Sequence, residues 1–260
     1  MVSNGVLDPL YIEIIKSNDS NYRYKLLNDA AVVDLAAFLY NNSEFIVFAA
    51  NILEECTNVS NLSNVLSNFF EENYGDDLTD EQRDKNNKFI DLTCTFYSDC
   101  SGEGKKLSDY RGALLERVTL LFILERYMYF EDIYLPIDKE LLNCGCDMDI
   151  DCDINICHAG WETDNPIDIA GWNQNTLMGE GYECKIKITS MKQSDDDILY
   201  KLYEICNSSP HIEKFNVGVV TFSSIEGYEF YFKFLNDNDR STSEVKVYGR
   251  SNFTDLKNVF

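Results

Sequence analysis

The chain has 260 residues and a formal net charge of −23, because 45 acidic side chains outnumber 22 basic ones. Its 45% apolar content, with only four prolines, is enough to bury a hydrophobic core and excludes a disordered chain. The excess of acid argues against a protein that binds nucleic acid unaided through a broadly basic surface.

The sequence predicts a soluble, cytoplasmic protein. Residues 1–10 show neither a basic cluster nor a long apolar run, so no signal peptide is predicted. The most apolar stretch, residues 30–52, is not predicted to span a bilayer because polar residues interrupt it at Asp34, Asn41, Asn42, Ser43 and Glu44. The nine cysteines lack the spacing of a disulfide framework and are predicted to be reduced thiols.

Residues 1–100 are predicted to form a helical N-terminal region. Within it, residues 22–72 carry apolar side chains at helical spacing. Residues 75–80 are a polar break, where Thr79 and Gln82 have the spacing of a capping box that begins another helix. The glycine-rich, charged stretch 100–106 is predicted to be a linker, which makes residues 107–260 a second region.

After the linker, helices and strands are predicted to alternate. Ser108 or Asp109 is a candidate cap for a long helix that ends near residue 129. Residues 149–157 alternate strictly, which predicts a strand with one face formed by Ile150, Cys152, Ile154 and Ile156. Residues 166–172 and 181–188 predict two further strands around a polar turn.

The last part of the chain continues this alternation. Residues 195–206 have the spacing of an amphipathic helix, and residues 215–222 that of a buried strand. A helix is predicted at 224–235, a strand at 244–248 and a short helix at 254–260. The order predicts an α/β (α+β) fold with a mixed central sheet flanked by helices.

The strands at 166–188 carry an unusual set of charges. Alternation places Glu183, Lys185 and Lys187 on one face of the second strand. Charges in an otherwise apolar strand are costly unless a cation or a substrate charge compensates them. Asp168, on the neighbouring strand of the same hairpin, can come alongside Glu183.

These residue types favour metal-dependent hydrolysis of a phosphodiester. Two carboxylates at short range repel each other, and hard divalent cations such as Mg²⁺ bind such clusters. A bound cation activates water, and the Lys185 ammonium can orient or deprotonate that water and stabilise the transition state. The simpler interpretation is a cross-strand ion pair between Glu183 and Lys185 on a solvated sheet face.

Asp168, a 14-residue gap and then Glu183-Cys184-Lys185 resemble the active-site motif of the PD-(D/E)xK (restriction-endonuclease-like) nuclease superfamily. That superfamily adds a glutamate on the preceding helix, and Glu116, at the end of Arg111-Gly-Ala-Leu-Leu-Glu116, matches it. The face of that helix is small and apolar, so a lone carboxylate there requires a partner, such as a water at the metal site. The resemblance covers about residues 109–248, with Pro166 two positions before Asp168 rather than directly before it.

The resemblance implies a cytoplasmic endonuclease that cuts DNA with Mg²⁺ or Mn²⁺, as the nuclease subunit of a prokaryotic restriction or anti-phage defence system. It implies catalytic roles for Glu116, Asp168, Glu183 and Lys185, with Asp168, Glu183, Cys184 and Glu116 around the metal. Because the chain is acidic, a protein partner or self-assembly is expected to supply affinity for DNA. The alternative is a non-catalytic, partner-binding subunit that keeps the nuclease fold, although the complete set of four residues argues against it.

Overall fold

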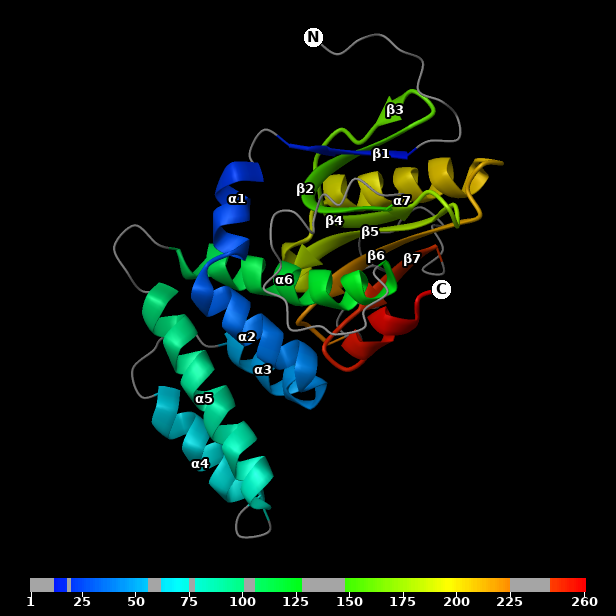
Figure 1. Cartoon of the computed structure of the whole chain (residues 1–260). Helices are drawn as coiled ribbons and strands as arrows, with labels where there is room; N and C mark the ends of the chain where they lie inside the picture. Colours follow the sequence, from blue (N-terminus) through cyan, green and yellow to red (C-terminus); the bar gives the residue numbers. More distant parts are fainter. Residues whose placement is uncertain are drawn as a thin grey trace.

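The structure is a computed structural model that describes residues 12–17, 20–55, 62–74, 78–100, 106–127, 148–224 and 244–260 (Figure 1). These residues form a mixed sheet flanked by helices, which confirms the predicted α/β (α+β) class. The helix predicted at 224–235 lies, apart from residue 224, outside the described residues, and so does most of the predicted linker.

The described part of the chain contains a seven-stranded sheet in the order β1-β2-β4-β5-β6-β7, with the short β3 paired to β2. Neighbouring strands from β1 to β5 are antiparallel, whereas β5–β6 and β6–β7 are parallel. The strands are β1 (Ile12–Lys16), β2 (Met148–His158), β3 (Trp161–Glu162), β4 (Ile167–Asn173), β5 (Met178–Lys185), β6 (Lys214–Thr221) and β7 (Val245–Tyr248).

Helices cover both faces of this sheet. In Figure 1, α7 lies on one face and α6 on the other, with α1 and α2 packed against α6 and the α4–α5 hairpin farther out. The α-helices are α1 (Ser20–Leu27), α2 (Ala30–Asn41), α3 (Ile46–Glu55), α4 (Leu62–Tyr74), α5 (Asp80–Cys100), α6 (Leu107–Tyr127) and α7 (Gln193–Ser208). Short 3-10 helices lie at η1 (Ser43–Phe45), η3 (Ile188–Ser190) and η4 (Phe253–Asn258).

Several boundaries predicted from local sequence are confirmed. The capping box before α5 is reciprocal: the Thr79 N–H donates to Gln82 Oε1 at 3.0 Å, and the Gln82 N–H donates to Thr79 Oγ1 at 3.3 Å. Helices α6 and α7 and strands β6 and β7 lie close to their predicted positions, and the short helix predicted near the end of the chain is η4.

Strand β1 is not predicted by the sequence pattern. Its five residues pair with β2, with Ile12 registered opposite His158. Ile12 is buried whereas Ile15 is exposed, so the apolar residues of β1 do not mark one face. The N-terminal region therefore contributes an edge strand to the sheet as well as helices. The division into residues 1–100 and 107–260 stays a prediction.

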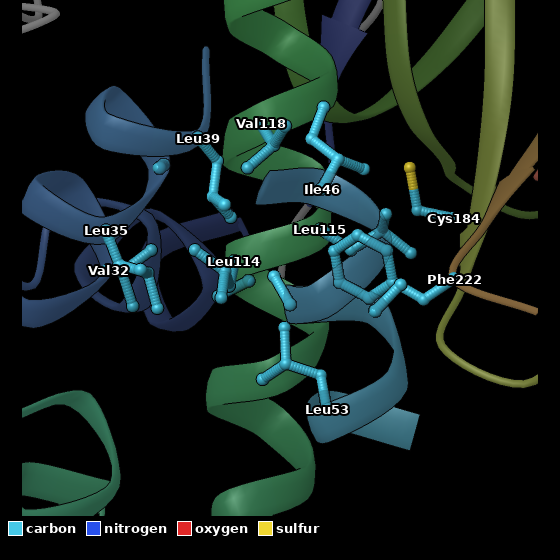
Figure 2. Packing of buried hydrophobic residues seen from close by; sticks show 14 of the residues in the cluster. Val32, Leu35, Leu39, Ile46, Leu53, Leu114, Leu115, Val118, Cys184 and Phe222 are labelled. Carbon is cyan, nitrogen blue, oxygen red and sulfur yellow. The ribbon is translucent and has the colours of Figure 1, made fainter. Parts of the chain in front are cut away.

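Two hydrophobic clusters form the core, one on each face of the sheet. The α6-side cluster joins α2, α3 and α6 to Cys184 of β5 and to Phe222, which follows β6 (Figure 2). The α7-side cluster includes Trp172 and Leu199. Since residues 113–120 of α6 are all buried, this helix lies inside the molecule rather than on its surface.

The prediction that four apolar side chains share one face of β2 is wrong. Ile150 and Cys152 belong to the α6-side cluster, whereas Ile154 and Ile156 belong to the α7-side cluster. The change of face occurs at Asp153, whose φ is 54°. Aspartate tolerates this left-handed conformation better than most residues because its short polar side chain bonds to groups nearby, and here the Ser17 hydroxyl donates to Asp153 Oδ2 at 3.0 Å.

Within the described ranges, no single helix is long and apolar enough to cross a membrane. The consecutive segments Ala30–Asn41 and Ser43–Glu54 reach the required length and composition only together, and they are bent by 109° at the break between them.

Candidate active site

The predicted acidic residues lie where β4 and β5 separate. The last registered β4–β5 pair at this end is Ile169 opposite Tyr182, but β5 continues along β6 until Lys185 lies opposite Thr221. From Glu183 to Lys185, β5 is therefore paired on its β6 side only. Side chains must satisfy the main-chain groups that face the other way.

Asp168 supplies the missing acceptor. Its Oδ2 accepts a hydrogen bond from the main-chain N–H of Cys184 at 2.6 Å. The registered pairs Cys152–Ile169 and Ile154–Ile167 place Asp153 of β2 opposite Asp168 of β4. The change of face in β2 at Asp153 therefore lies next to the point where β4 separates from β5. This geometry holds the Asp168 carboxylate beside the main chain between Glu183 and Lys185.

Glu183 and Lys185 form an ion pair in which Lys185 Nζ donates to Glu183 Oε1. Lys185 Nζ also lies 3.3 Å from Asp195 Oδ2 in the first turn of α7. The simpler interpretation of the motif required this ion pair to lie on a solvated sheet face. Glu183 is only 8% exposed, so the pair does not lie on such a face. Lys187 lies beyond the end of β5 and is exposed.

Burial perturbs all three groups. Burial and the negative charge of Asp168 raise the pKa of Glu183 to about 8, despite the neighbouring Lys185. Burial also raises the pKa of Asp168, against the opposing effects of Lys185 and the Cys184 N–H. Burial lowers the pKa of Lys185, but the carboxylates of Glu183 and Asp168 outweigh it and raise that pKa above its ordinary value. Both carboxyl groups thus have pKa values above their ordinary ones, whereas Lys185 keeps its charge.

Glu116 is fully buried on α6 and has a partner that the sequence did not indicate. Arg23 of α1 binds both of its oxygens: Nε donates to Oε2 at 2.7 Å and Nη2 donates to Oε1. The guanidinium lies over Gly112, where an added Cβ would come within 3.0 Å of Nη2. The partner of Glu116 in this structure is therefore a guanidinium rather than the water expected from the motif.

The charge of Arg23 also acts on an acidic residue of the sheet. The positive charge of Arg23 acts to lower the pKa of Asp168, although burial prevails there. Cys184 contacts the same helix, since its Sγ lies 3.9 Å from Oγ1 of Thr119, one turn after Glu116. The open edge of β5 thus has Asp168, Glu183 and Lys185 around it, whereas Glu116 is paired with Arg23.

Only part of the predicted set of metal ligands suits a divalent cation. The described residues contain no group of three or more His, Cys, Asp or Glu side chains placed to hold a metal ion. Mg²⁺ needs fewer, because it keeps several waters and binds through one or two carboxylates together with substrate phosphates. Asp168 and Glu183 fit that requirement, because a cation would relieve the repulsion between the half-buried carboxyl group of Asp168 and the buried one of Glu183. The Cys184 thiol does not, because it contacts α6 and is a soft ligand.

Two charged residues of the site were not predicted: Arg23 and Asp195. The available sequence signal was Gly112, because a glycine inside a helix costs about 1 kcal/mol relative to alanine and therefore suggests a close neighbour. No local pattern pairs that glycine with an arginine 93 residues from Glu116.

A second buried arginine–carboxylate pair ties α6 to the sheet. Arg126 Nε donates to Glu180 Oε1 at 2.9 Å, and the Tyr182 hydroxyl donates to Glu180 Oε2 at 2.6 Å. Glu180 is fully buried and lies in the stretch of β5 that is still paired with β4. This pair provides a structural counterpart to Arg23–Glu116.

Comparisons with known proteins leave the family open. No family model matches the chain, and no curated protein matches it. Among solved structures, the chain is similar to protein VC1899 from Vibrio cholerae, with 15% sequence identity and a TM-score of 0.40. The alignment covers 96% of this chain and 57% of that one, so this chain spans less than two thirds of the length of VC1899.

The raised pKa of Glu183 predicts a pH-dependent stability in metal-free buffer. Its pKa of about 8 in the folded protein exceeds its ordinary value of 4.5, so the folded state binds the proton more tightly than the unfolded chain does. The stability that Glu183 contributes is complete below about pH 4.5 and is lost as the pH rises to about 8. Glu183→Gln is expected to remove this slope, which amounts to at most about 1.4 kcal/mol per pH unit.

The measurement is urea unfolding in EDTA at a series of pH values. Glu81→Gln, at an exposed position of α5, controls for the loss of one acidic residue. If the Glu183→Gln protein kept the wild-type pH dependence, Glu183 would not be the group that titrates.

Arg23→Ala is expected to lower the free energy of unfolding by about 3 kcal/mol, because it leaves the Glu116 carboxylate buried without its partner. The Arg23 side chain is 25% exposed and that of Glu116 is 1% exposed. The matched control is Lys85→Ala, which breaks the surface pair with Glu81 and should cost under about 0.5 kcal/mol. If both variants lost a similar, small free energy of unfolding, Arg23 would contribute no more to stability than a surface residue does.

Proposed function

We propose that the chain is a divalent-metal-dependent nuclease of the PD-(D/E)xK type that hydrolyses phosphodiester bonds of DNA. The observation that carries this proposal is the hydrogen bond from the Cys184 N–H to Asp168. That bond fixes a carboxylate from β4 beside Glu183 and Lys185 of β5, at the point where the sheet opens. Two acids and a lysine in one buried site are the groups that this chemistry requires.

Asp168 and Glu183 are the residues that would hold Mg²⁺ or Mn²⁺, which would supply an activated water and neutralise charge on the scissile phosphate. Glu183 carries a proton up to about pH 8 and must release it to become a ligand. Lys185 stays protonated between Glu183 and Asp195, so it acts as a fixed positive charge on the phosphate rather than as a base. The sequence motif alone left both roles of Lys185 open.

Lys185→Ala is expected to reduce cleavage of plasmid DNA at least about 100-fold, because it removes a positive charge that stabilises the transition state. The assay compares Mg²⁺, Mn²⁺ and EDTA, with and without the proteins encoded beside this chain. Lys201→Ala is the control, since Lys201 is a half-exposed lysine of α7 that lies 3.9 Å from Asp164.

Undiminished cleavage by the Lys185→Ala protein would refute the role of this lysine. If the wild-type chain and its neighbours together show no metal-dependent cleavage, the proposed activity is wrong.

A basic partner protein is proposed to supply the affinity for DNA. Contacts between phosphates and Lys or Arg dominate such affinity, and 22 basic residues against 45 acidic ones leave few available. The first basic residues after Lys185 in the sequence are Lys187 and Lys192. A dependence on a partner also suits a nuclease of restriction or anti-phage defence, because the isolated chain would be harmless to its host.

The partner is placed on a groove of about 330 Å³ between α3 and α4. Its lining is apolar and includes Phe48 and Ile52, and the neighbouring Val65 and Phe69 are 61% and 38% exposed. Carboxylates border this face, as Glu44 and Glu81 line the adjoining hollow of about 520 Å³. A basic helix with apolar anchors is complementary to such a surface. This groove also favours the second candidate function, a non-catalytic subunit that binds a partner.

The isolated chain is expected to bind a generic DNA duplex with a Kd no tighter than about 1 µM at near-physiological salt. The reason is the net charge of −23, which repels the phosphate backbone. The measurement is a fluorescence-anisotropy titration with Ca²⁺ in place of Mg²⁺ to prevent cutting. Submicromolar binding by the single chain would contradict the need for a partner.

A further inference from the structure

We propose that the hollow beside Glu44 and Glu81 is a pocket for one basic side chain of the partner, and that Asn86 binds the charged end of that side chain. This inference rests on the proposed function, because it names the group by which a basic partner would be recognised. The observation that carries it is a buried amide without a hydrogen bond on a mostly apolar helix face.

Asn86 occupies a core position of α5. The buried residues of this helix recur at helical spacing and form one face: Asn86, Phe89, Ile90, Thr93, Phe96, Tyr97 and Cys100. Apart from Thr93, the residues that follow Asn86 on this face are hydrophobic. A leucine at position 86 would extend the face and pack against the core, so packing does not explain the asparagine.

The Asn86 amide is buried without compensation. It is only 8% exposed, and in the part of the chain that the structure describes no hydrogen bond reaches its side chain. A buried amide without a partner destabilises the fold, because it has lost its hydrogen bonds to water. Asn86 nevertheless lines two hollows, of about 520 Å³ and 160 Å³. A group that entered the larger hollow would therefore reach the amide.

The larger hollow suits an aliphatic chain that ends in a positive charge. Four apolar side chains line it: Phe45, Phe48, Phe70 and Leu78. Glu44 and Glu81 line it as well, and Lys85, 3.4 Å from Glu81 Oε1, is the one basic residue among its described lining. Lysine and arginine combine an apolar stem with a charged head. The Asn86 Oδ1 atom would accept a hydrogen bond from that head.

This hollow adjoins the apolar groove between α3 and α4. Phe48 and Phe70 line both of them. A helix that presents a leucine and a lysine or arginine on neighbouring turns would therefore place the apolar side chain in the groove and the basic one in the hollow. An acidic helix would meet repulsion from Glu44 and Glu81 instead.

The test is a fluorescence-anisotropy titration of the full chain against a labelled synthetic helix, with leucines on one face and lysines on the other, at near-physiological salt. Asn86→Leu is expected to weaken binding about tenfold, the effect of losing one hydrogen bond to a charged group. The same substitution should raise the urea concentration at the midpoint of unfolding, because it replaces an unsatisfied amide with an apolar side chain.

Two further variants separate a specific pocket from general attraction to an acidic protein. Glu44→Gln, at an exposed position, should also weaken binding of the lysine helix and provides a second variant in case Asn86→Leu does not fold. The matched control is Glu204→Gln, which removes one exposed carboxylate from α7 and should leave the affinity unchanged. A helix with glutamate in place of lysine should bind the wild type more weakly than the lysine helix does.

Weaker binding by Asn86→Leu and Glu44→Gln, with unchanged binding by Glu204→Gln, supports the inference. If Asn86→Leu and Glu44→Gln bind the lysine helix as the wild type does, the pocket is overturned, and weaker binding by Val65→Asp would then still keep the apolar groove. If the wild type does not bind the helix, the groove and the pocket are both overturned. Nuclease activity is decided separately by the plasmid assay, because these titrations contain no nucleic acid.

Discussion

The candidate site depends on one hydrogen bond, the one by which the main-chain N–H of Cys184 reaches an acceptor. A buried N–H without an acceptor is costly, and β4 has already separated from β5 at this position. The Asp168 side chain takes the place of the main-chain carbonyl. A carboxylate is therefore required inside the sheet for structural reasons, and the same requirement brings it beside Glu183 and Lys185.

Helix α6 also buries charged groups, because it carries charged side chains through the core. Glu116 and Arg117 are 0% and 2% exposed, and burial lowers the pKa of Arg117 to about 10. Buried charges are tolerated where partners compensate them, and Arg23 compensates Glu116. The α6 side of the site is consequently stable without a cation, whereas the repelling carboxyl groups on β4 and β5 are not fully compensated.

Features caused by residues close together in the sequence could be predicted, whereas features caused by contacts between distant segments could not. The capping box at Thr79 and the amphipathic spacing of α7 are local, and both were predicted from sequence. The spacing of Asp168, Glu183 and Lys185 is nearly local, because one hairpin carries all three. Strand β1, the change of face at Asp153 and the contact of Arg23 with Glu116 depend on segments far apart in the chain. Neither periodicity nor propensity could identify them.

The charges around the open edge of β5 indicate an order of binding. Four carboxyl groups act on one another there, from Asp153, Asp168, Glu183 and Asp195, against the two basic groups of Arg23 and Lys185. A phosphodiester that approached this edge first would meet a net negative field. A divalent cation that bound first would displace the proton of Glu183 and still offset part of this negative charge. If the proposed function holds, the cation would therefore bind before the nucleic acid does.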